Sequence, residues 1–407
     1  MNFLWVIDLA YSTRLHHGGL LRYFNLSREL IAQGHSVRFA VNFEDQREQA
    51  AEWLESLKAE NALTDFCELK LDRSISPWRR AAALLLPFGF HERAIRPFVD
   101  DAMAALTAAA RRFPCDIVIV SSRTLIFAAH NFRLRPCIAD FSDSATLYAW
   151  RELKGSLRAG AARLSLRRAL DLAHFFFRER HSARRYAAGI VVSPVDKRSF
   201  DRFTDPRKIA CIANGVLSPG PAGVSKIPHQ ILFSGVMNFP PNYQAALWFL
   251  DHVFPRVRKV RPDLTFVIAG AHPPQPLLAR ASAHVQIPGF VPDLNQLISR
   301  SALYVAPLIS GGGFKNKVVE AIANGTFVIG TSLAAEFLEP RIRALMSIHD
   351  DPREMADAIC GFFARPAAYA ERLEQLRRIV ADEFSWPKKA AELAEFARSV
   401  ITAHPPA

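Results

Sequence analysis

The chain has 407 residues, of which 50% are hydrophobic and 22% are charged, a composition typical of folded rather than disordered proteins. This length predicts two domains of roughly 150–200 residues each. The formal net charge of +12 is compatible with three kinds of partner, namely nucleic acid, an anionic membrane or phosphorylated substrates.

The N-terminal part of the chain has the pattern of a strand, a glycine loop, a helix and a second strand. Residues 3–8 form an apolar run that ends at an acid, as buried parallel strands do. A loop with Gly18 and Gly19 follows, and apolar residues then recur at helical spacing as far as Gly34. With a strand at 36–41, this predicts a βαβ unit and a parallel sheet. Further strands of this domain are predicted at 116–121, 137–141 and 189–193.

A second α/β unit is predicted from about residue 211 onwards. Residues 211–216 lead into residues 218–228, which are rich in Pro, Gly and Ser, as linkers are. The strands predicted after this linker are 230–234, 264–269, 285–287, 303–307 and 327–330. Two open sheets of this kind imply a cleft, with ligands at the carboxyl ends of the strands.

The segment that follows the strand at 303–307 carries groups suited to a nucleotide. These are three glycines, two lysines and a glutamate: Gly311, Gly312, Gly313, Lys315, Lys317 and Glu320. Glycines let backbone amides approach an anion, and the next helix directs its positive N-terminus to the same place. The lysines suit a diphosphate, and the glutamate can accept hydrogen bonds from ribose hydroxyls. A tight turn with two solvated lysines is the alternative, and the spacing fits neither a Walker A loop nor a Rossmann fingerprint.

The order of these motifs resembles that of family 4 retaining glycosyltransferases, especially those of exopolysaccharide and lipid-linked glycan assembly. The matching segments are Gly18-Gly19, Gly34-His35, 213–216, 231–235, 241–242, 288–293, 313–325 and 384–386. The resemblance implies the GT-B fold, with two Rossmann-like α/β/α domains facing across a cleft. Residues 1–210 would bind the acceptor and residues 211–385 the nucleotide sugar. Residues 386–407 would form a closing helix that crosses back to the N-terminal domain.

The resemblance also implies roles for single residues. Glu320 would bind the donor ribose and Lys317, with Lys315, would neutralise the diphosphate, so Lys317 and Glu320 are the predicted catalytic residues. Phe290 and Val291 would border the base. The other predicted donor-binding residues are Gly18, Gly19, Ser234, Gly235, Gly311, Gly312 and Gly313. The substrate would be a nucleoside diphosphate sugar of the UDP or GDP type, with no metal or other cofactor, because protein cations would stabilise the leaving diphosphate.

Three departures from the family pattern concern charged or catalytic positions. Gly312 stands where the family often has a glutamate, as in a glycine-rich variant of the motif, and residues 235–242 lack the usual Arg and Lys. These two departures shift phosphate binding onto the two lysines. Many members also have a histidine where this chain has Ser121-Ser122-Arg123. The resemblance therefore assigns no residue to the chemistry on the acceptor side. The candidates there are His16, His17, Arg123, Asp140 and Asp143, with surface-loop, capping or turn roles as the alternatives.

Two segments, 78–98 and 151–185, are both basic and apolar. Residues 151–185 hold ten Lys/Arg, interleaved with Leu and Phe. This pattern fits a helix on an anionic membrane and also a core-facing helix with a solvated basic face. Nucleic acid is not expected, because the Phe clusters suit burial. On the membrane interpretation the acceptor is a glycan or a polyprenyl-linked sugar.

The cysteines and the apolar runs bear on the compartment. Five scattered cysteines without a C-x-x-C pair favour reduced thiols. No signal peptide is expected, and the apolar run at 81–90 is shorter than the about 20 residues of a membrane span. We therefore expect a cytoplasmic enzyme, at the inner face of the cell membrane if the basic segments bind lipid. The alternatives are a degenerate GT-B protein that binds a nucleotide sugar or a partner without transfer, and another GT-B enzyme such as a sugar-nucleotide epimerase.

Overall fold

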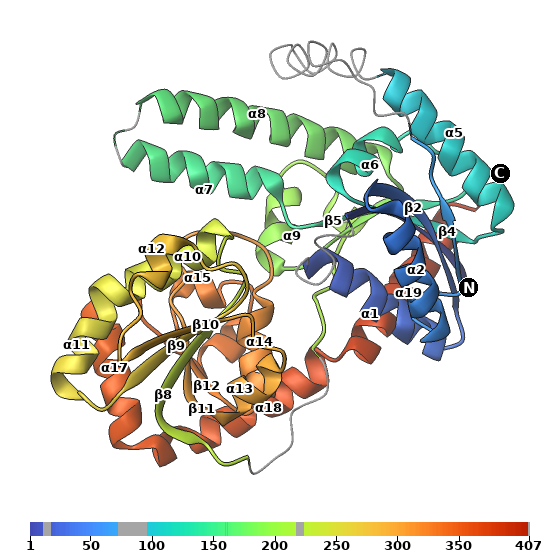
Figure 1. Cartoon of the computed structure of the whole chain (residues 1–407). Coiled ribbons are helices and arrows are strands. Elements are labelled where there is room, and N and C mark those ends of the chain that lie inside the picture. Colours follow the sequence, from blue (N-terminus) through green and yellow to red (C-terminus); the bar gives the residue numbers. More distant parts are fainter. Residues whose placement is uncertain (11–17, 72–95, 159, 161, 217–223, 406–407) are drawn as a thin grey trace. The chain divides into compact units, whose positions relative to one another are not determined.

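The computed structural model describes residues 1–10, 18–71, 96–158, 160, 162–216 and 224–405 (Figure 1). The chain divides into two compact units. Unit 1 comprises Met1–Ala213 and Trp386–Ala407, and unit 2 comprises Asn214–Ser385. The sequence placed the limits at residues 210 and 385.

Unit 1 is built on a seven-stranded parallel sheet with the strand order β3-β2-β1-β4-β5-β6-β7. The strands are β1 (Asn2–Ala10), β2 (Ser36–Asp45), β3 (Asp65–Glu68), β4 (Ile117–Ser121), β5 (Cys137–Ser142), β6 (Ala188–Val191) and β7 (Ile209–Cys211). The helices are α1 (Gly18–Ala32), α2 (Arg47–Ala59), α5 (Arg96–Arg112), α6 (Arg123–Ala128), α7 (Ala145–Arg158), α8 (Ala162–Arg185), α9 (Pro194–Phe200), the 3₁₀ turn η2 (Pro206–Lys208) and α19 (Trp386–Ala403). The order of the strands reverses between β1 and β4, which makes the carboxyl ends of these strands the topological switch point.

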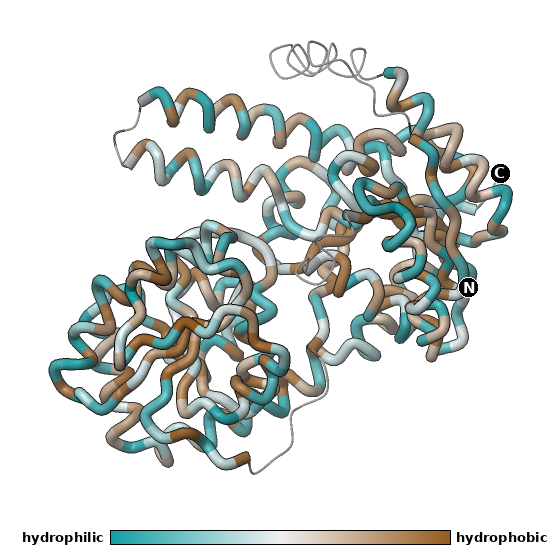
Figure 2. Tube along the Cα trace, in the orientation of Figure 1, coloured by the Kyte–Doolittle hydropathy of each residue, from teal (hydrophilic) through white to brown (hydrophobic). Residues whose placement is uncertain are grey.

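Both faces of this sheet are buried, because alternate residues of β1 enter two different cores. Trp5 belongs to the core that α1 and α19 cover, and its neighbour Leu4 belongs to the core that α5 and α6 cover. The C-terminal helix α19 contributes Trp386 and Leu393 to the first of these cores. The strands are accordingly among the most hydrophobic parts of the trace (Figure 2).

Unit 2 is built on a six-stranded parallel sheet with the order β10-β9-β8-β11-β12-β13. The strands are β8 (Ile227–Ser234), β9 (Thr265–Ala269), β10 (Val285–Gly289), β11 (Ser301–Ala306), β12 (Phe327–Gly330) and β13 (Ser347–Ile348). The helices are α10 (Pro240–Trp248), the π-helix η3 (Phe249–Val253), α11 (Phe254–Val260), α12 (Gln275–Leu278), α13 (Leu294–Arg300), α14 (Asn316–Ala323), α15 (Ser332–Ala335), α16 (Pro340–Arg343), α17 (Pro352–Ala364), η4 (Pro366–Tyr369) and α18 (Ala370–Glu383). The strand order reverses between β8 and β11, so their carboxyl ends form the switch point of unit 2.

These two parallel α/β units confirm the predicted fold class. Strand β7 was not predicted from the sequence, and it pairs with β6 as the edge strand of unit 1. Within the described residues, no helix is both long and apolar enough to cross a bilayer.

Candidate functional site

The glycine loop of unit 2 connects the carboxyl end of β11 to the first turn of α14. Gly311 and Gly313 have φ angles of +107° and +69°, which favour glycine. A Cβ atom on Gly311 would lie 3.3 Å from the ring of Pro241, at the start of α10. The loop therefore packs against the beginning of the helix that follows β8, at the switch point.

The Lys315 side chain holds this loop in shape from inside. Its ammonium group donates hydrogen bonds to the carbonyl oxygens of Gly312 and Gly313, both at 2.8 Å, and lies 3.5 Å from Glu336 Oε1. The residue is only 7% exposed. That Lys315 also neutralises a diphosphate stays a prediction.

Lys317, on the first turn of α14, reaches across to the segment that follows β8. Its Nζ donates to Asn242 Oδ1 at 2.5 Å and lies 4.7 Å from the ring centroid of Phe233. Asn242 Nδ2 in turn donates to the carbonyl oxygen of Val236 at 2.9 Å. Burial, with help from the nearby Lys315 charge and against the attraction of Glu320, lowers the pKa of Lys317 to about 7. An anion placed beside this amine would draw a proton onto it.

Gly235 makes room for the Lys317 ammonium. A Cβ atom at this position would lie 2.6 Å from both Lys317 Nζ and Asn242 Nδ2, and its φ angle is +154°. The backbone at Gly270 lies even closer to Gly235, because a Cβ atom on Gly270 would be 1.7 Å from the Gly235 carbonyl oxygen. The backbone at the ends of β8 and β9 therefore requires glycine at both positions.

Glu320 lies one helical turn beyond Lys317 on α14. Burial raises the pKa of its carboxyl group, and the Lys317 charge opposes that shift. Within the part of the chain that the structure describes, its carboxylate accepts no hydrogen bond. The side chain keeps both oxygens available for hydroxyl groups of a ligand.

The other predicted donor-side residues occupy different environments. The Ser234 hydroxyl is 1% exposed and lies 2.9 Å from Tyr304 Oη, so it joins β8 to β11 inside the sheet. Phe290 is 62% exposed and Val291 is half-buried, both just beyond the end of β10. Asn242 was not among the predicted site residues, although the Pro-Pro-Asn that opens α10, shortly after Gly235, could have indicated it.

Asp140, one of the predicted acceptor-side residues, is an interior residue at the carboxyl end of β5. It pairs with Arg22 at 3.3 Å, and the two side chains are 0% and 1% exposed. Asp140 Oδ1 also accepts the Ser142 N–H at 3.1 Å, and Arg22 Nη1 donates to the Ala213 carbonyl at 3.2 Å. Asp140 thus fixes α1 to the end of the sheet.

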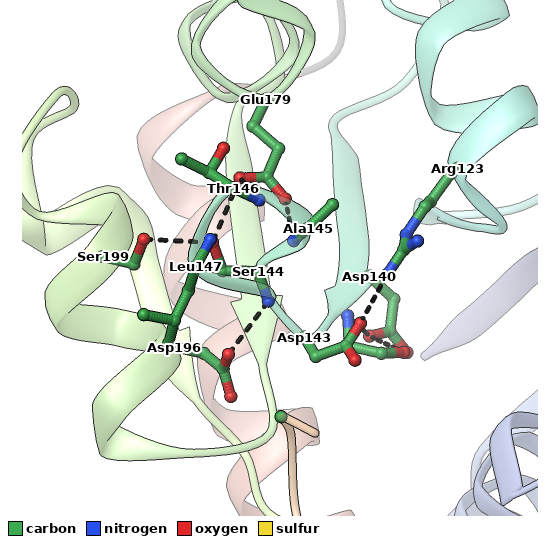
Figure 3. Close-up of polar contacts among 12 residues, drawn as sticks. Arg123, Asp140, Asp143, Ser144, Ala145, Thr146, Leu147, Glu179, Asp196 and Ser199 are labelled. Atoms are coloured by element: carbon green, nitrogen blue, oxygen red, sulfur yellow. Dashed lines mark hydrogen bonds and ion pairs between the residues drawn. The ribbon is translucent and has the colours of Figure 1, made fainter. Parts of the chain in front are cut away.

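Arg123 and Asp143 form an ion pair of 3.0 Å near the same edge of the sheet (Figure 3). Their side chains are 54% and 38% exposed, so both are accessible from solvent. Ser122 and Ser142, at the ends of β4 and β5, have φ angles of +82° and +59°. Such backbone strain in residues other than glycine is common where side chains are aimed at a ligand.

Glu179 on α8 is a buried acid that the sequence did not single out. Its carboxylate accepts the backbone N–H groups of Ala145 and Thr146 at 2.5 and 3.2 Å and the Ser144 hydroxyl at 3.1 Å (Figure 3). It therefore caps the N-terminus of α7. Burial raises the pKa of Glu179 to about 7 despite these hydrogen bonds. In the sequence, only its position as an acid among the many cations of α8 could have indicated a structural role for Glu179.

Some predicted residues lie outside the described part of the chain. These are His16, His17 and most of the basic segment 78–98. Gly18 and Gly19 are the first two residues of α1. Among the described residues, no group of three or more His, Cys, Asp and Glu is arranged to hold a metal ion.

The sequence of unit 2 matches a known protein family. Residues 228–365 match the family model described as Glycosyl transferases group 1. A curated relative from Klebsiella pneumoniae, an uncharacterized 44.6 kDa protein in the cps region, is 28% identical over 117 residues. That alignment spans 26% of this chain and 30% of the relative, so the chain matches less than a third of the relative's length.

Solved structures show the same fold over the whole chain. Anabaena Alr3699/HepE, in complex with UDP and glucose, superposes with a TM-score of 0.66 at 15% identity, covering 98% of this chain and 100% of that one. WaaG, a glycosyltransferase involved in lipopolysaccharide biosynthesis, superposes with a TM-score of 0.61 at 13% identity, covering 97% and 99%. These likenesses identify the fold as GT-B. Together with the family match on unit 2, they confirm the predicted enzyme class, glycosyltransferase.

Proposed function

We propose that this enzyme transfers a sugar, with retention of anomeric configuration, from a nucleoside diphosphate sugar to a glycan acceptor carried on a lipid. The observation that carries the donor half of the proposal is the cluster of Lys317, Asn242 and Gly235 beside Glu320, at the switch point of unit 2. Ligands of open α/β sheets bind at such points.

The cluster fits the chemistry of a leaving diphosphate. Negative charge grows on the diphosphate as the bond to the sugar breaks. The Lys317 ammonium and the N-terminal N–H groups of α14 lie together to stabilise it. Glu320, with its carboxylate free of protein hydrogen bonds among the described residues, would bind the ribose hydroxyls. Phe290, exposed just after β10, would border the base.

Three further points support the finer parts of the proposal. The HepE structure holds UDP, which favours a UDP-type donor here. WaaG is involved in lipopolysaccharide biosynthesis, which favours a glycan acceptor carried on a lipid. Retention follows from the resemblance to family 4, with Gly312 as the glycine-rich variant of the motif. The basic and apolar character of α7 and α8 favours work at an anionic membrane surface, on the cytoplasmic side.

A nucleotide panel tests the donor site. UDP, GDP, ADP and their sugars are added to the full chain, and stabilisation against heat is measured, which grows with ligand concentration over Kd. We expect UDP and a UDP-sugar to stabilise the protein, and Lys317→Ala and Glu320→Ala to abolish the effect. Lys259→Ala, which removes an exposed cation at the end of α11, is the matched control. Unchanged nucleotide affinity in both site variants would refute the site.

Turnover tests the reaction itself. Retaining transferases slowly hydrolyse their donor without acceptor, so the right nucleotide sugar should release free sugar. Removing one group that stabilises the leaving diphosphate is expected to lower this rate about 10²–10³-fold. NMR of the anomeric proton in the first product reports retention or inversion. An inverted product would refute the retaining mechanism but would not contradict the proposed donor site.

A further inference from the structure

Two adjoining cavities open on unit 1, at the amino ends of its later strands. The first, of about 300 Å³, is lined by Pro136 and Cys137 at the start of β5, and by Ala187 just before β6. The second, of about 450 Å³, lies beside it, near the start of β7. Ser122, Ser142 and Asp140 lie at the opposite, carboxyl ends of β4 and β5. The two cavities are therefore separate from the acceptor edge of the same sheet.

The lining of both cavities is rich in cations. The first cavity is lined by Arg133, Arg135, Arg184, Arg185 and Lys208. The second shares Arg184 and Lys208 with it and adds Arg180 and Arg202. The one acid in the two linings, among the described residues, is Asp205, and it pairs with Arg207 at 2.9 Å.

Among the described residues, none of the seven cations in these linings forms an ion pair with a carboxylate. Several are instead held by neutral acceptors: Arg185 donates to Asn131 Oδ1 at 2.7 Å, and Lys208 Nζ donates to the Arg184 carbonyl at 3.3 Å. Such bonds fix the side chains and leave their charge available. Burial lowers the pKa of Lys208, against the attraction of the Asp205 carboxylate.

An exposed apolar stripe on α8 leads to these cavities. Leu166, Leu170 and Phe177 are 68%, 56% and 51% exposed, and their spacing of four and seven residues places them on one helix face. Arg180 and Arg184 continue the same face at the next two helical steps. The α7–α8 hairpin extends from the rest of unit 1, and its trace alternates between hydrophobic and hydrophilic residues (Figures 1 and 2). One helix face thus joins apolar surface to unpaired positive charge.

We propose that this face of unit 1 seats on an anionic phospholipid bilayer. Lipid phosphate groups enter the two basic cavities, and the α8 stripe lies among the upper acyl chains. Arginine clusters suit phosphate oxygens, and exposed apolar side chains beside cations are the pattern of helices that bind in the bilayer interface. The inference rests on the proposed membrane-borne acceptor and names the surface that would meet the lipid.

Vesicle co-sedimentation of the full chain tests this surface. We expect binding to phosphatidylcholine vesicles that contain phosphatidylglycerol and little binding to pure phosphatidylcholine. Arg180→Gln/Arg184→Gln should weaken binding about thirtyfold, which corresponds to about 2 kcal/mol for two cations near the bilayer. The matched control, Lys259→Gln/Arg300→Gln, removes two exposed cations from unit 2 and should bind as the original chain does. Equal binding by both double variants would overturn the proposal.

Two further measurements separate the possible causes of a negative result. An unchanged melting temperature shows that a variant is folded, and UDP stabilisation reports the donor site independently of the lipid. Loss of vesicle binding with UDP stabilisation intact supports the proposal, whereas absent UDP stabilisation in every chain contradicts only the donor site. Stabilisation by free pyrophosphate that Arg180→Gln/Arg184→Gln abolishes, without vesicle binding by the original chain, would overturn the lipid assignment and indicate a soluble phosphate ligand.

Discussion

Raising the pH from about 7 to about 9 is expected to weaken UDP binding about fiftyfold, because Lys317 loses its proton in the free protein. Its pKa in the free protein is lowered to about 7 from an ordinary value of 10.5. A bound diphosphate favours the charged form and returns the pKa towards the ordinary value. About half of the free molecules carry the charge at about pH 7 and about one in a hundred at about pH 9. Since the bound form has the higher pKa, binding takes up a proton across this range.

Calorimetric titration with UDP measures both the affinity and the proton. At about pH 8, the heat of binding in two buffers of different ionisation enthalpy should reveal uptake of about one proton per UDP. Lys317→Arg is the control, because a guanidinium keeps its charge at every pH used. Its affinity should be independent of pH, and its heat independent of the buffer. If UDP binding to the original chain is as tight at about pH 9 as at about pH 7, with no buffer-dependent heat, the ammonium of Lys317 does not contact the diphosphate.

Substitutions at three other positions follow from the contacts of the site and of the α7 cap. Asn242→Ala removes the acceptor that holds the Lys317 ammonium. It should weaken UDP binding at least about tenfold in the same titration, since hydrogen bonds to charged groups contribute about 1.5–3 kcal/mol. Unchanged UDP affinity would contradict this role of Asn242. Gly235→Ala places a Cβ atom 2.6 Å from that ammonium, so we expect a lower melting temperature and the loss of UDP stabilisation, and a fully active variant would show that the loop can shift at no cost. Glu179→Ala leaves two buried N–H groups of α7 without their acceptor and should lower the free energy of unfolding by about 1–3 kcal/mol for each, measured in urea. Burial raises the pKa of Glu179 from 4.5 to about 7. Protonation of Glu179 therefore stabilises the fold fully below a pH of 4.5, and this stabilisation is lost as the pH rises through about 7. Glu179→Gln should remove this part of the pH dependence of the free energy of unfolding.

The fold could be predicted from the sequence because its strands are buried on both faces. Such strands read as continuous apolar runs, and the run at 3–8 became β1, which extends from Asn2 to Ala10. Strand β7 was not predicted, because it is only three residues long and so gives little pattern. Hydrophobicity also carries no information about the neighbour of a strand, which for Cys211 is Val191 in β6.

The proposed donor site was predictable only where a motif is local in the sequence. Lys317 and Glu320 share one helix with the glycine loop, so their proximity follows from spacing alone. Asn242 meets Lys317 across 75 residues, and only the folded sheet brings them together. For Lys315, the sequence predicted the position beside the glycine loop but not the contacts of the ammonium group. The ammonium donates to the Gly312 carbonyl because of the conformation of the loop, which the sequence does not reveal. Glu179 likewise acts through backbone N–H groups 34 residues away.

The two cationic regions that we propose to bind anions differ in burial. Lys317 is enclosed between Asn242, Phe233 and Gly235, so an interaction with a diphosphate would be weakly screened by salt. Arg180 and Arg184 instead line an open cavity at the end of the exposed α8 stripe, within reach of counterions. The Debye length shrinks from about 10 Å at 0.1 M salt to about 3 Å at 1 M. Added salt should therefore release the protein from anionic vesicles while UDP still binds, because only the exposed cations exchange their partner for ions in solution.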